Sequence, residues 1–294
     1  MRLLGSGLKA GLQPHYPAGH CSESLMPETG SRLLNVAIES AKAGGDVLMS
    51  YFRQGVSIRC KGGESADLVS EADVNAEQAV IRVIHAAFPE HAILGEESAT
   101  DTDPLSPALW VIDPLDGTTN FLHDVPHFAV SIGYFEYGQP VCGVIWNPAR
   151  DDLYSALKGH GATHNGRVLR VSSTDRLDQS LIGTGFPVKR DAKVQATFAA
   201  IDELFALNIH CIRRFGSAAL DLCHVASGLY GAFFEYQLSA WDFAAGMLIV
   251  QEAGGQVTNG RGEPLTLTRS SILATNGQLH PQMLEIVGRH HEGC

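Results

Sequence analysis

The sequence predicts a layered α/β fold, in which helices and β-sheets pack into one unit with a cleft between its two halves. In the second half of the chain, strand-like and helix-like segments alternate, which is typical of a sheet covered by helices. The first half combines two helical patterns with several short, mostly antiparallel strand patterns. The 294 residues are 45% hydrophobic, and no Pro-, Gly- or Ser-rich linker separates the halves. One sizeable shared core is therefore expected.

The first 30 residues are expected to form a flexible extension. They are rich in Gly, Pro and Ser and show no periodicity. They also lack the continuous apolar run of a secretory signal. Met26 stands directly before the first helical pattern, and we take it as a candidate natural start of the protein.

Two helices are expected in the first half. The first has an apolar face at helical spacing, made of Leu34, Ile38, Ala41 and Leu48. Ser31 is its predicted N-cap, because serine side chains satisfy free N–H groups at helix starts. The second helix starts near Asp73, and its apolar face consists of Ala76, Val80, Val83 and Ile84.

Strand patterns follow these helices. In chain order they cover residues 91–98, 108–117, 128–148 and 151–172. A Tyr-Gly-Gln-Pro turn at residues 137–140 divides the third segment into two strands. Asn165-Gly166 predicts a tight hairpin turn in the fourth, because both residues tolerate the positive φ angles of such turns.

The second half predicts three strands and three helices in alternation. The strands are expected at 180–186, 209–215 and 230–236, and the helices at 192–207, 217–228 and 241–255. We therefore expect one domain over residues 31–290, with halves at about 31–172 and 173–290 on either side of the cleft. Residues 291–294 are expected to be a tail, and the "RHHEGC" stretch a solvated end rather than a zinc site.

Composition excludes some classes of protein and partner. The formal net charge is −11, from 32 acids against 21 Lys and Arg, which argues against nucleic acid as the main ligand. An anionic substrate would instead need a bound cation. No run of about 18 apolar residues is present, so no membrane span is expected. The six cysteines are scattered, which indicates reduced thiols and a cytoplasmic protein.

Acidic residues gather in a segment without cations. Residues 83–149 contain no Lys or Arg, and two of their strand patterns end in acid pairs. Glu96 and Glu97 end one strand, and Asp113 and Asp116 end the next. Like charges held a few ångströms apart are costly unless a proton or cation lies between them. A hard divalent ion with oxygen ligands would satisfy this requirement.

The stretch Asp113-Pro114-Leu115-Asp116 has the features of a coordination loop. Proline fixes the turn, so both carboxylates and the Leu115 carbonyl can point to one place. Gly117 allows close approach of the backbone, and Gly-Thr-Thr-Asn at 117–120 predicts a helix start, whose N–H groups bind anions. Metal and phosphate would meet there, as metal-assisted phosphoryl transfer to water requires. Taken alone, the two acids could equally be helix caps or surface charges.

Six motifs can be compared with those of known families: "GEES" at 95–98, "DPLDGTTNF" at 113–121, "WDFAAGMLIVQEAGG" at 241–255, "DLVSEAD" at 67–73, "RRFGSAALDL" at 213–222 and "FFE" at 233–235. Together they resemble the inositol monophosphatase family of Mg²⁺-dependent, lithium-sensitive phosphatases, above all its bacterial members. The resemblance covers about residues 31–290. It implies an αβαβα sandwich like that of the fructose-bisphosphatases, a homodimer, and two to three Mg²⁺ ions.

The resemblance also implies the metal ligands. One Mg²⁺ would be held by Glu96, Asp113 and the carbonyl of Leu115. A second would be held by Asp113, Asp116 and Asp242, so that Asp113 bridges the two ions. A weaker third ion would bind Glu96 through waters. Without the family, Asp242 could simply be an N-terminal cap of its helix.

The remaining implied roles concern water and substrate. Thr118, hydrogen-bonded to Asp73, would orient the attacking water on the metal near Glu96. The N–H groups of Gly117 and Thr118 would bind phosphate oxygens. The alcohol hydroxyls would contact three residues, namely Asp116, Ala218 (through its backbone) and Glu235. Every one of these positions carries the residue that the family pattern expects.

The expected activity is hydrolysis of a small polyol phosphate, with inositol 1-phosphate as the first candidate. Fructose-bisphosphatase, histidinol-phosphatase and 3′-phosphonucleotide phosphatase remain alternatives within the superfamily. "GTTNF" favours the inositol type, because the nucleotide branch resembles G-T-K-E-F at that position. Glu235, seven residues before Asp242, matches the polyol-binding spacing. A non-catalytic interaction protein that keeps the fold is the alternative from another class, and the complete acid set argues against it.

Overall fold

The structure is a computed structural model that describes residues 28–54, 58–60, 68–98, 101–187 and 191–291. The expected extension up to residue 27, with the candidate start at Met26, lies outside the described residues. Within the described part of the chain, no helix combines the length and the apolar character needed to cross a bilayer. Cys142, Cys211 and Cys223 are free thiols, as their scattered positions predicted.

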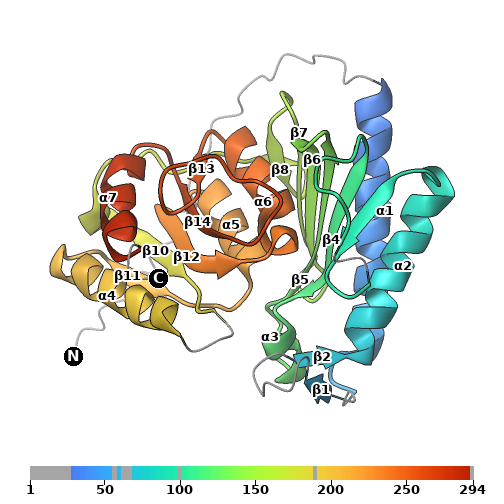
Figure 1. Cartoon of the computed structure of the whole chain (residues 1–294), viewed down its shortest axis with the longest axis horizontal. Coiled ribbons are helices and arrows are strands. Elements are labelled where there is room, and N and C mark those ends of the chain that lie inside the picture. Colours follow the sequence, from blue (N-terminus) through green and yellow to red (C-terminus); the bar gives the residue numbers. More distant parts are fainter. Residues whose placement is uncertain (1–27, 55–57, 61–67, 99–100, 188–190, 292–294) are drawn as a thin grey trace, which may run out of the picture.

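The described residues form seven α-helices in chain order. They are α1 (Glu28–Tyr51), α2 (Glu71–Ala87), α3 (Thr118–Leu122), α4 (Ala192–Ala206), α5 (Ala218–Ala226), α6 (Ala240–Glu252) and α7 (His280–His291). Six of them pair into layers around two sheets (Figure 1): α1 with α2, then the larger sheet, α5 with α6, the smaller sheet, and α4 with α7. This order is the αβαβα sandwich that the family resemblance implied. The short α3 lies at one end of the larger sheet.

The larger sheet has seven strands in sequence order. They are β3 (Ala92–Gly95), β4 (Leu109–Asp116), β5 (Ala129–Glu136), β6 (Gln139–Asn147), β7 (Asp152–Leu157), β8 (Ala162–His164) and β9 (Arg167–Val168). All neighbours are antiparallel except β3 and β4, which run parallel. The parallel pair matters for function, because both of its strands end at the same edge of the sheet.

Two hairpin turns of this sheet use backbone conformations with positive φ. Asn165 and Gly166 join β8 to β9 at φ 47° and 76°, which confirms the predicted turn. Tyr137 and Gly138 join β5 to β6 at φ 50° and 74°. The predicted four-residue turn was too long here, because residues 139–140 already pair within β6. Two-residue turns of this kind match the twist of the strands that they connect.

The smaller sheet belongs to the second half of the chain. Its strands are β10 (Leu181–Thr184), β11 (Cys211–Arg213), β12 (Ala232–Leu238), β13 (Gln256–Thr258) and β14 (Ser270–Thr275), in the order β11-β10-β12-β14-β13. The first three strands in that order are parallel and the last two pairings are antiparallel. Every strand and helix predicted for residues 180–255 is present. A separate antiparallel pair joins β1 (Ile58–Cys60) to β2 (Leu68–Ser70).

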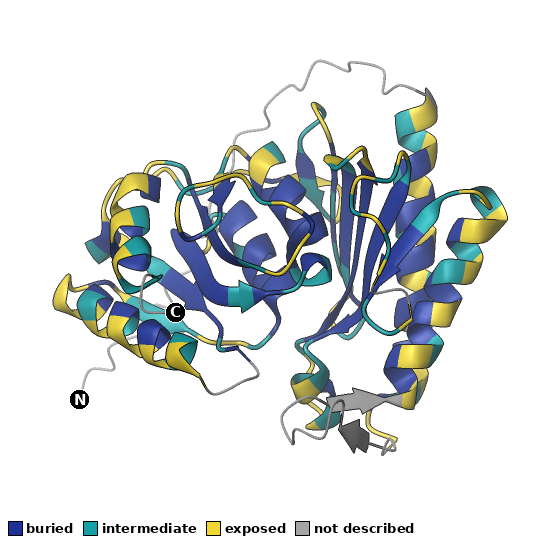
Figure 2. Cartoon of the chain, in the orientation of Figure 1, coloured by how far each residue is buried: buried dark blue, intermediate teal, exposed yellow. Residues whose placement is uncertain are grey.

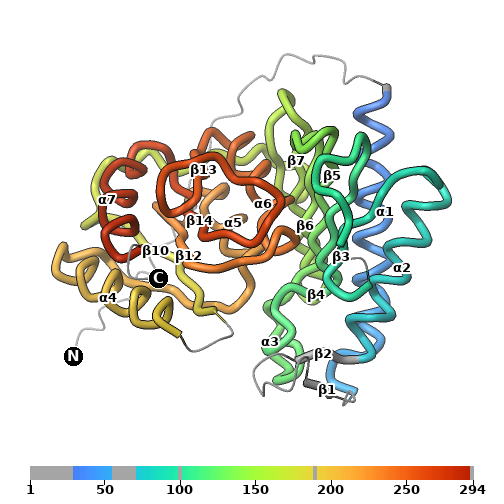
Figure 3. Tube along the Cα trace, viewed as in Figure 1, coloured from blue at the N-terminus to red at the C-terminus, as the bar shows by residue number. Residues whose placement is uncertain are grey.

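Three hydrophobic clusters fill the spaces between the five layers, and the buried residues of the elements that contain them are dark blue in Figure 2. One lies between the larger sheet and α1 with α2, one surrounds α5 and α6 between the sheets, and one lies beneath α4 and α7. The middle cluster runs from Leu94 in the first half to Ala274 in the second. In Figure 3 the first half of the chain runs from blue to yellow-green and the second half from yellow to red. The two halves therefore share one core.

Helix α6 packs closely against the larger sheet. It is apolar on nearly every side, as a helix enclosed between two sheets must be. Its backbone comes so near β6 that a Cβ at Gly143 would lie 2.7 Å from the carbonyl oxygen of Ala245. This close approach fixes the position of α6, whose first turn carries one of the predicted metal ligands.

Two predicted boundaries were wrong. Helix α1 begins at Glu28, so the last three residues of the expected extension are helical, and Ser31 lies inside the helix rather than capping it. At the other end of the chain, α7 continues to His291, where Arg289 forms an ion pair and His290 a hydrogen bond with Glu203 of α4.

Candidate active site

The site begins at a β-bulge near the end of β4. Asp113 of β4 pairs with Ser131 of β5, and pairing resumes with Asp116 opposite Ala129. Residues 113–116 thus lie opposite residues 129–131, so β4 contains one extra residue. In a regular strand, residues three apart point to opposite faces. The extra residue allows Asp116 to turn toward the side occupied by Asp113.

Asp242 reaches the same place from the start of α6. Its Oδ2 accepts a hydrogen bond from the backbone N–H of Ser239 at 2.6 Å, within a capping box. One carboxylate oxygen each from Asp113, Asp116 and Asp242 lies within 4.8 Å of the others. Asp242 is therefore both the helix cap considered from the sequence and a member of the acid cluster.

Asp116 is held by the first turn of α5, which comes from the other half of the molecule. Its Oδ2 accepts hydrogen bonds from Ser217 Oγ at 2.5 Å and from the backbone N–H of Ala219 at 2.8 Å. The backbone N–H of Ala218 donates to Asp116 Oδ1 at 3.3 Å. Ala218, which we expected at the substrate hydroxyls, thus has its N–H directed to Asp116 in this structure.

Thr118, the first residue of α3, lies between two oxygens. Its Oγ1 is 3.3 Å from Asp73 Oδ1 and 3.1 Å from the carbonyl oxygen of Leu115, and its single hydroxyl proton can be donated to either. Gly117 caps α3 at φ 97°, a conformation that favours glycine. A Cβ at Gly117 would also lie 3.0 Å from the carbonyl oxygen of His127. The predicted helix start at 117–120 is therefore present.

Glu96 follows directly after β3 at the edge where β4 also ends. Its backbone N–H donates to the carbonyl oxygen of Ile112 at 3.3 Å, which extends the parallel pairing by one residue. The side chain is half-buried. Among the described residues, the group of oxygens within 4.8 Å of one another contains Asp113, Asp116 and Asp242 but not Glu96.

Glu235 lies on β12 and is buried. Its carboxylate lies against Gly185, where a Cβ would come within 1.9 Å of Glu235 Oε2. Only glycine at that position leaves room for this side chain. Arg214 is exposed, and its guanidinium lies over Gly216. It is therefore a surface cation beside the site.

Burial and mutual repulsion raise the pKa values of the clustered acids. Burial raises the pKa of Asp113 well above its ordinary value, and the charges of Glu96, Asp116 and Asp242 raise it further. Burial raises the pKa of Asp116 to about 6, although hydrogen bonds from Ser217 and the α5 backbone oppose the shift. The pKa of Asp242 is raised by burial, then by Asp116 and Glu96. Buried oxygen donors that repel one another fit a divalent cation.

The sequence matches a known family over nearly its whole described length. A sequence model of the inositol monophosphatase family matches residues 30–292. The chain belongs to the inositol monophosphatase family. Members of this family are metal-dependent phosphatases, and the acid cluster is a candidate site for such a metal.

Some proteins with similar sequences are named as inositol monophosphatases and others as Nus factors. The chain is 42% identical over 250 residues to an inositol-1-monophosphatase of Synechocystis, with 85% of this chain and 86% of that protein covered. It is 40% identical over 262 residues to the Nus factor SuhB of Pseudomonas aeruginosa, with 88% and 96% covered. Proteins similar to this chain therefore include one named as a phosphatase and one named as a Nus factor.

Solved structures of the family superpose well on this one. The SuhB protein of Bartonella henselae gives a TM-score of 0.80 at 37% identity, over 87% of this chain and 98% of that one. Staphylococcal IMPase-II with inositol monophosphate bound gives 0.75 at 31% identity, over 88% and 95%. The same enzyme with 2′AMP bound gives 0.75 at 31%, over 89% and 96%.

One buried acid near the family's motifs escaped the sequence analysis. Glu77 of α2 accepts hydrogen bonds from the backbone N–H of Glu97 at 3.0 Å and from Ser98 Oγ. It stands four residues after Asp73, so both acids lie on one face of the helix. That spacing was visible in the sequence, but the apolar residues of the same helix defined the face that we considered.

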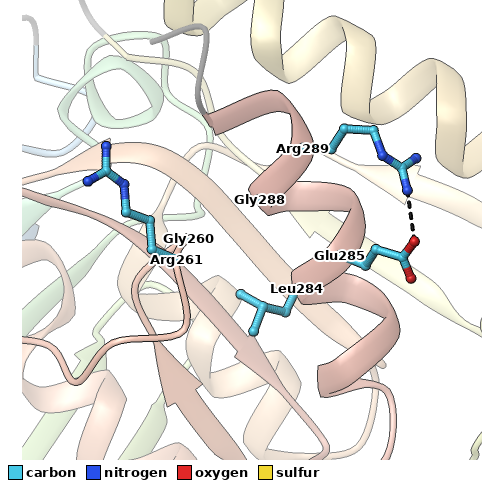
Figure 4. A pocket seen from close by; sticks show the side chains of 6 residues that line it. All are labelled: Gly260, Arg261, Leu284, Glu285, Gly288 and Arg289. Atoms are coloured by element: carbon cyan, nitrogen blue, oxygen red, sulfur yellow. Dashed lines mark hydrogen bonds and ion pairs between the residues drawn. The ribbon is translucent and has the colours of Figure 1, made fainter.

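A groove on the outer side of the smaller sheet is a separate feature. It runs between α7 and the loop at residues 260–261 (Figure 4). Glu285 pairs with Arg289 at 2.9 Å along α7, while the Arg261 side chain points away from that pair. These groups do not converge on one point, so the groove lacks the arrangement of a catalytic site.

We predict that Mg²⁺ affinity rises with pH. An acid whose pKa is raised in the folded protein keeps its proton to higher pH, and a metal ion must displace that proton to bind. For Asp116, with a pKa of about 6 against an ordinary 3.8, this competition acts below about pH 6. The affinity should rise about tenfold per pH unit for each proton displaced, until the cluster is ionised. Isothermal titration calorimetry at pH 5, 6, 7 and 8 measures it.

The control for this prediction is Asp113→Asn, which removes one ionisable group while keeping an acceptor for the Leu115 N–H. The variant should bind Mg²⁺ more weakly and show a flatter pH dependence. An affinity that does not change with pH in the unmodified protein would show that the cluster is already ionised without metal.

Proposed function

We propose that this protein is a Mg²⁺-dependent phosphomonoesterase that hydrolyses a small polyol phosphate, with inositol 1-phosphate as the preferred substrate. The observation that carries the proposal is the convergence of Asp113, Asp116 and Asp242, with oxygens within 4.8 Å and pKa values raised by burial and repulsion. Family membership supports the reaction class. The inositol-1-monophosphatase name of a 42% identical relative supports the substrate.

The acids of the site would bind two to three Mg²⁺ ions between them, and some acids would contact more than one ion. Asp113, Asp116 and Asp242 would hold one ion, and Asp113 with Glu96 and the Leu115 carbonyl another. A third would bind Glu96 through water. When bound, Mg²⁺ lowers the pKa of the attacking water and offsets the charge of the phosphoryl oxygens. The bulge at residues 113–116 and the capping contacts of Asp116 and Asp242 support this division, because they hold the carboxylates before the ion arrives.

Other residues of the chain would bind and orient the reactants. Thr118 donates a hydrogen bond to Asp73 through its hydroxyl and accepts a hydrogen bond from the attacking water. This contact would orient the water so that its lone pair points to phosphorus. The first N–H groups of α3, at Gly117 and Thr118, hold phosphate oxygens. Attack forms a new P–O bond and breaks the ester P–O bond, the water gives up one proton, and the leaving ester oxygen takes up one from solvent. The products are inorganic phosphate and the alcohol, which retains the ester oxygen.

Glu235 is the proposed hydroxyl-binding residue, together with Asp116. Burial raises the pKa of Glu235 well above its ordinary value, followed by the charge of Asp242, while Arg214 opposes the shift. A buried carboxylate of this kind gains from a hydroxyl donor on the substrate. Ala218, whose N–H is directed to Asp116, would assist through Asp116 rather than by direct contact.

The family resemblance leads us to propose three further properties. The protein would be a homodimer, its activity would be inhibited by lithium, and it would work in the cytoplasm.

We predict Mg²⁺-dependent release of phosphate from inositol 1-phosphate by the purified protein. Asp113→Asn should lower kcat/KM by at least about 10³-fold, because the ligand shared by both proposed ions loses its charge. A malachite-green assay with and without EDTA measures the reaction. The proposal fails if no sugar, polyol or nucleotide phosphate is hydrolysed in the presence of Mg²⁺.

We also predict that Glu235→Gln separates substrates by their hydroxyl groups. The variant should lower kcat/KM for inositol 1-phosphate about 10- to 100-fold, because it weakens hydrogen bonds to the alcohol. Hydrolysis of p-nitrophenyl phosphate, which has no hydroxyls, should change much less. A panel that adds 2′-AMP, histidinol phosphate and fructose 1,6-bisphosphate ranks the alternatives. Equal losses on all esters would argue against a hydroxyl-binding role.

A second candidate function is binding within a protein assembly. The 40% identity to the Nus factor SuhB of Pseudomonas aeruginosa supports this role. The Asp113→Asn variant distinguishes the two functions. It should lose the proposed hydrolysis, but because Asp113 is buried the surface available to a binding partner is unchanged. If binding matters, the variant should restore growth to a bacterial strain deleted for its own SuhB as well as the unmodified protein does. Rescue by the unmodified protein alone would assign the role to catalysis.

A further inference from the structure

Helix α2 carries two buried carboxylates one turn apart. Asp73 and Glu77 are each 1% exposed, and both belong to the face of α2 that is turned into the molecule. Two acids at this spacing repel each other and destabilise an isolated helix. Burial of a carboxylate adds a further cost unless the group is well hydrogen-bonded. Helix formation and core packing do not account for this pair.

Each acid of the pair contacts a different active-site segment. Asp73 lies 3.3 Å from the hydroxyl of Thr118, at the start of α3. Glu77 uses one oxygen for the backbone N–H of Glu97, at 3.0 Å, and the other for Ser98 Oγ. Glu77 therefore holds the two residues that follow Glu96. One helix thus supports both the proposed water-orienting residue and the segment that carries a proposed metal ligand.

Gly95 makes room for this contact. A Cβ at Gly95 would lie 2.6 Å from Glu77 Oε2, far inside van der Waals distance. Gly95 has no positive φ that would by itself require glycine. The absence of a side chain at the end of β3 is therefore explained by the carboxylate that passes over it. Gly95 and Glu77 form one steric unit directly before Glu96.

We propose that Glu77 is a positioning residue for Glu96. Its two hydrogen bonds fix the turn at residues 96–98, so that the Glu96 side chain stays at the edge where β3 and β4 both end, facing Asp113. This inference rests on the proposed metal-dependent function. When a group that hydrogen-bonds to a metal ligand, without binding the metal itself, is removed, the metal affinity commonly falls 10- to 100-fold.

Three substitutions on α2 test the role of Glu77. Glu77→Ala removes both acceptors and should raise the Mg²⁺ dissociation constant of the substrate-free protein at least tenfold, as measured by calorimetry. Glu77→Gln keeps an acceptor for the Glu97 N–H, and its amide can donate to Ser98 Oγ, so its affinity should stay within about threefold of the original. Glu71→Ala removes an exposed acid from the first turn of the same helix and should change nothing.

A double-mutant cycle adds a readout that general destabilisation would not reproduce. Gly95→Ala should by itself displace Glu77 and weaken Mg²⁺ binding as Glu77→Ala does. In the Glu77→Ala background, Gly95→Ala should have little further effect, because the clash is gone. Strong non-additivity is the expected result for two residues that act as one unit. Effects that simply multiply would overturn the inference.

The outcomes separate this inference from the proposed function. If the unmodified protein binds no Mg²⁺, the proposed function fails first. If it binds Mg²⁺ in a manner abolished by Asp113→Asn, yet Glu77→Ala binds equally well, then only the role of Glu77 is refuted. Should Glu77→Ala not fold, Ser98→Ala removes one of its two hydrogen bonds at an exposed residue. Unchanged affinity in Ser98→Ala and in Gly95→Ala would then refute it.

Discussion

The structure around the site depends on one electrostatic constraint, the repulsion among Asp113, Asp116 and Asp242 in a buried space. Asp113 and Asp242 each accept a backbone N–H hydrogen bond on one oxygen, from the β4 bulge and from the start of α6, and Asp116 accepts one on each oxygen from the first turn of α5. These N–H groups offset part of the negative charge and fix the direction of each carboxylate. They leave the remaining charge facing one point, where a divalent cation would complete the balance.

The layered fold explains how residues from distant segments reach that point. The larger sheet supplies Asp113 and Asp116 at the end of β4, and α6, enclosed between the sheets, supplies Asp242. Glu235 comes from the smaller sheet. Because α6 packs on β6 through Gly143 without an intervening side chain, the spacing between the layers is fixed by backbone contact. The acid cluster is therefore positioned by the core rather than by surface loops.

Much of this arrangement could be predicted from the sequence, and the exceptions have physical reasons. Periodicity gave the order of strands and helices, because apolar faces recur along the chain. The cation-free segment pointed to Asp113 and Asp116, because repelling acids need a partner. The bulge that turns Asp116 toward Asp113 was not predictable, since it depends on the register with β5. Glu77 was missed because its partners, at positions 97 and 98, meet it only in three dimensions.

The wrong prediction for the end of α7 also results from a contact that forms only in three dimensions. The last turn of α7 was expected to be solvated, but Glu203 on α4, far away in sequence, binds Arg289 and His290. Local composition carries no information about such a contact. The sequence did not identify the substrate for a related reason, because the converging acids indicate a class of reaction and carry no information about the alcohol.

The hydrogen bonds from the start of α5 to Asp116 limit how the two halves of the chain can move or be exchanged. Asp116 belongs to the first half by sequence, yet Ser217 and Ala219, from the second half, anchor its carboxylate. A shift of one half against the other would therefore pull the Asp116 carboxylate away from Asp113 and Asp242. Recombination that exchanged the second half for that of a distant relative would have to preserve the Ser217 hydroxyl and the N–H of Ala219 at this junction.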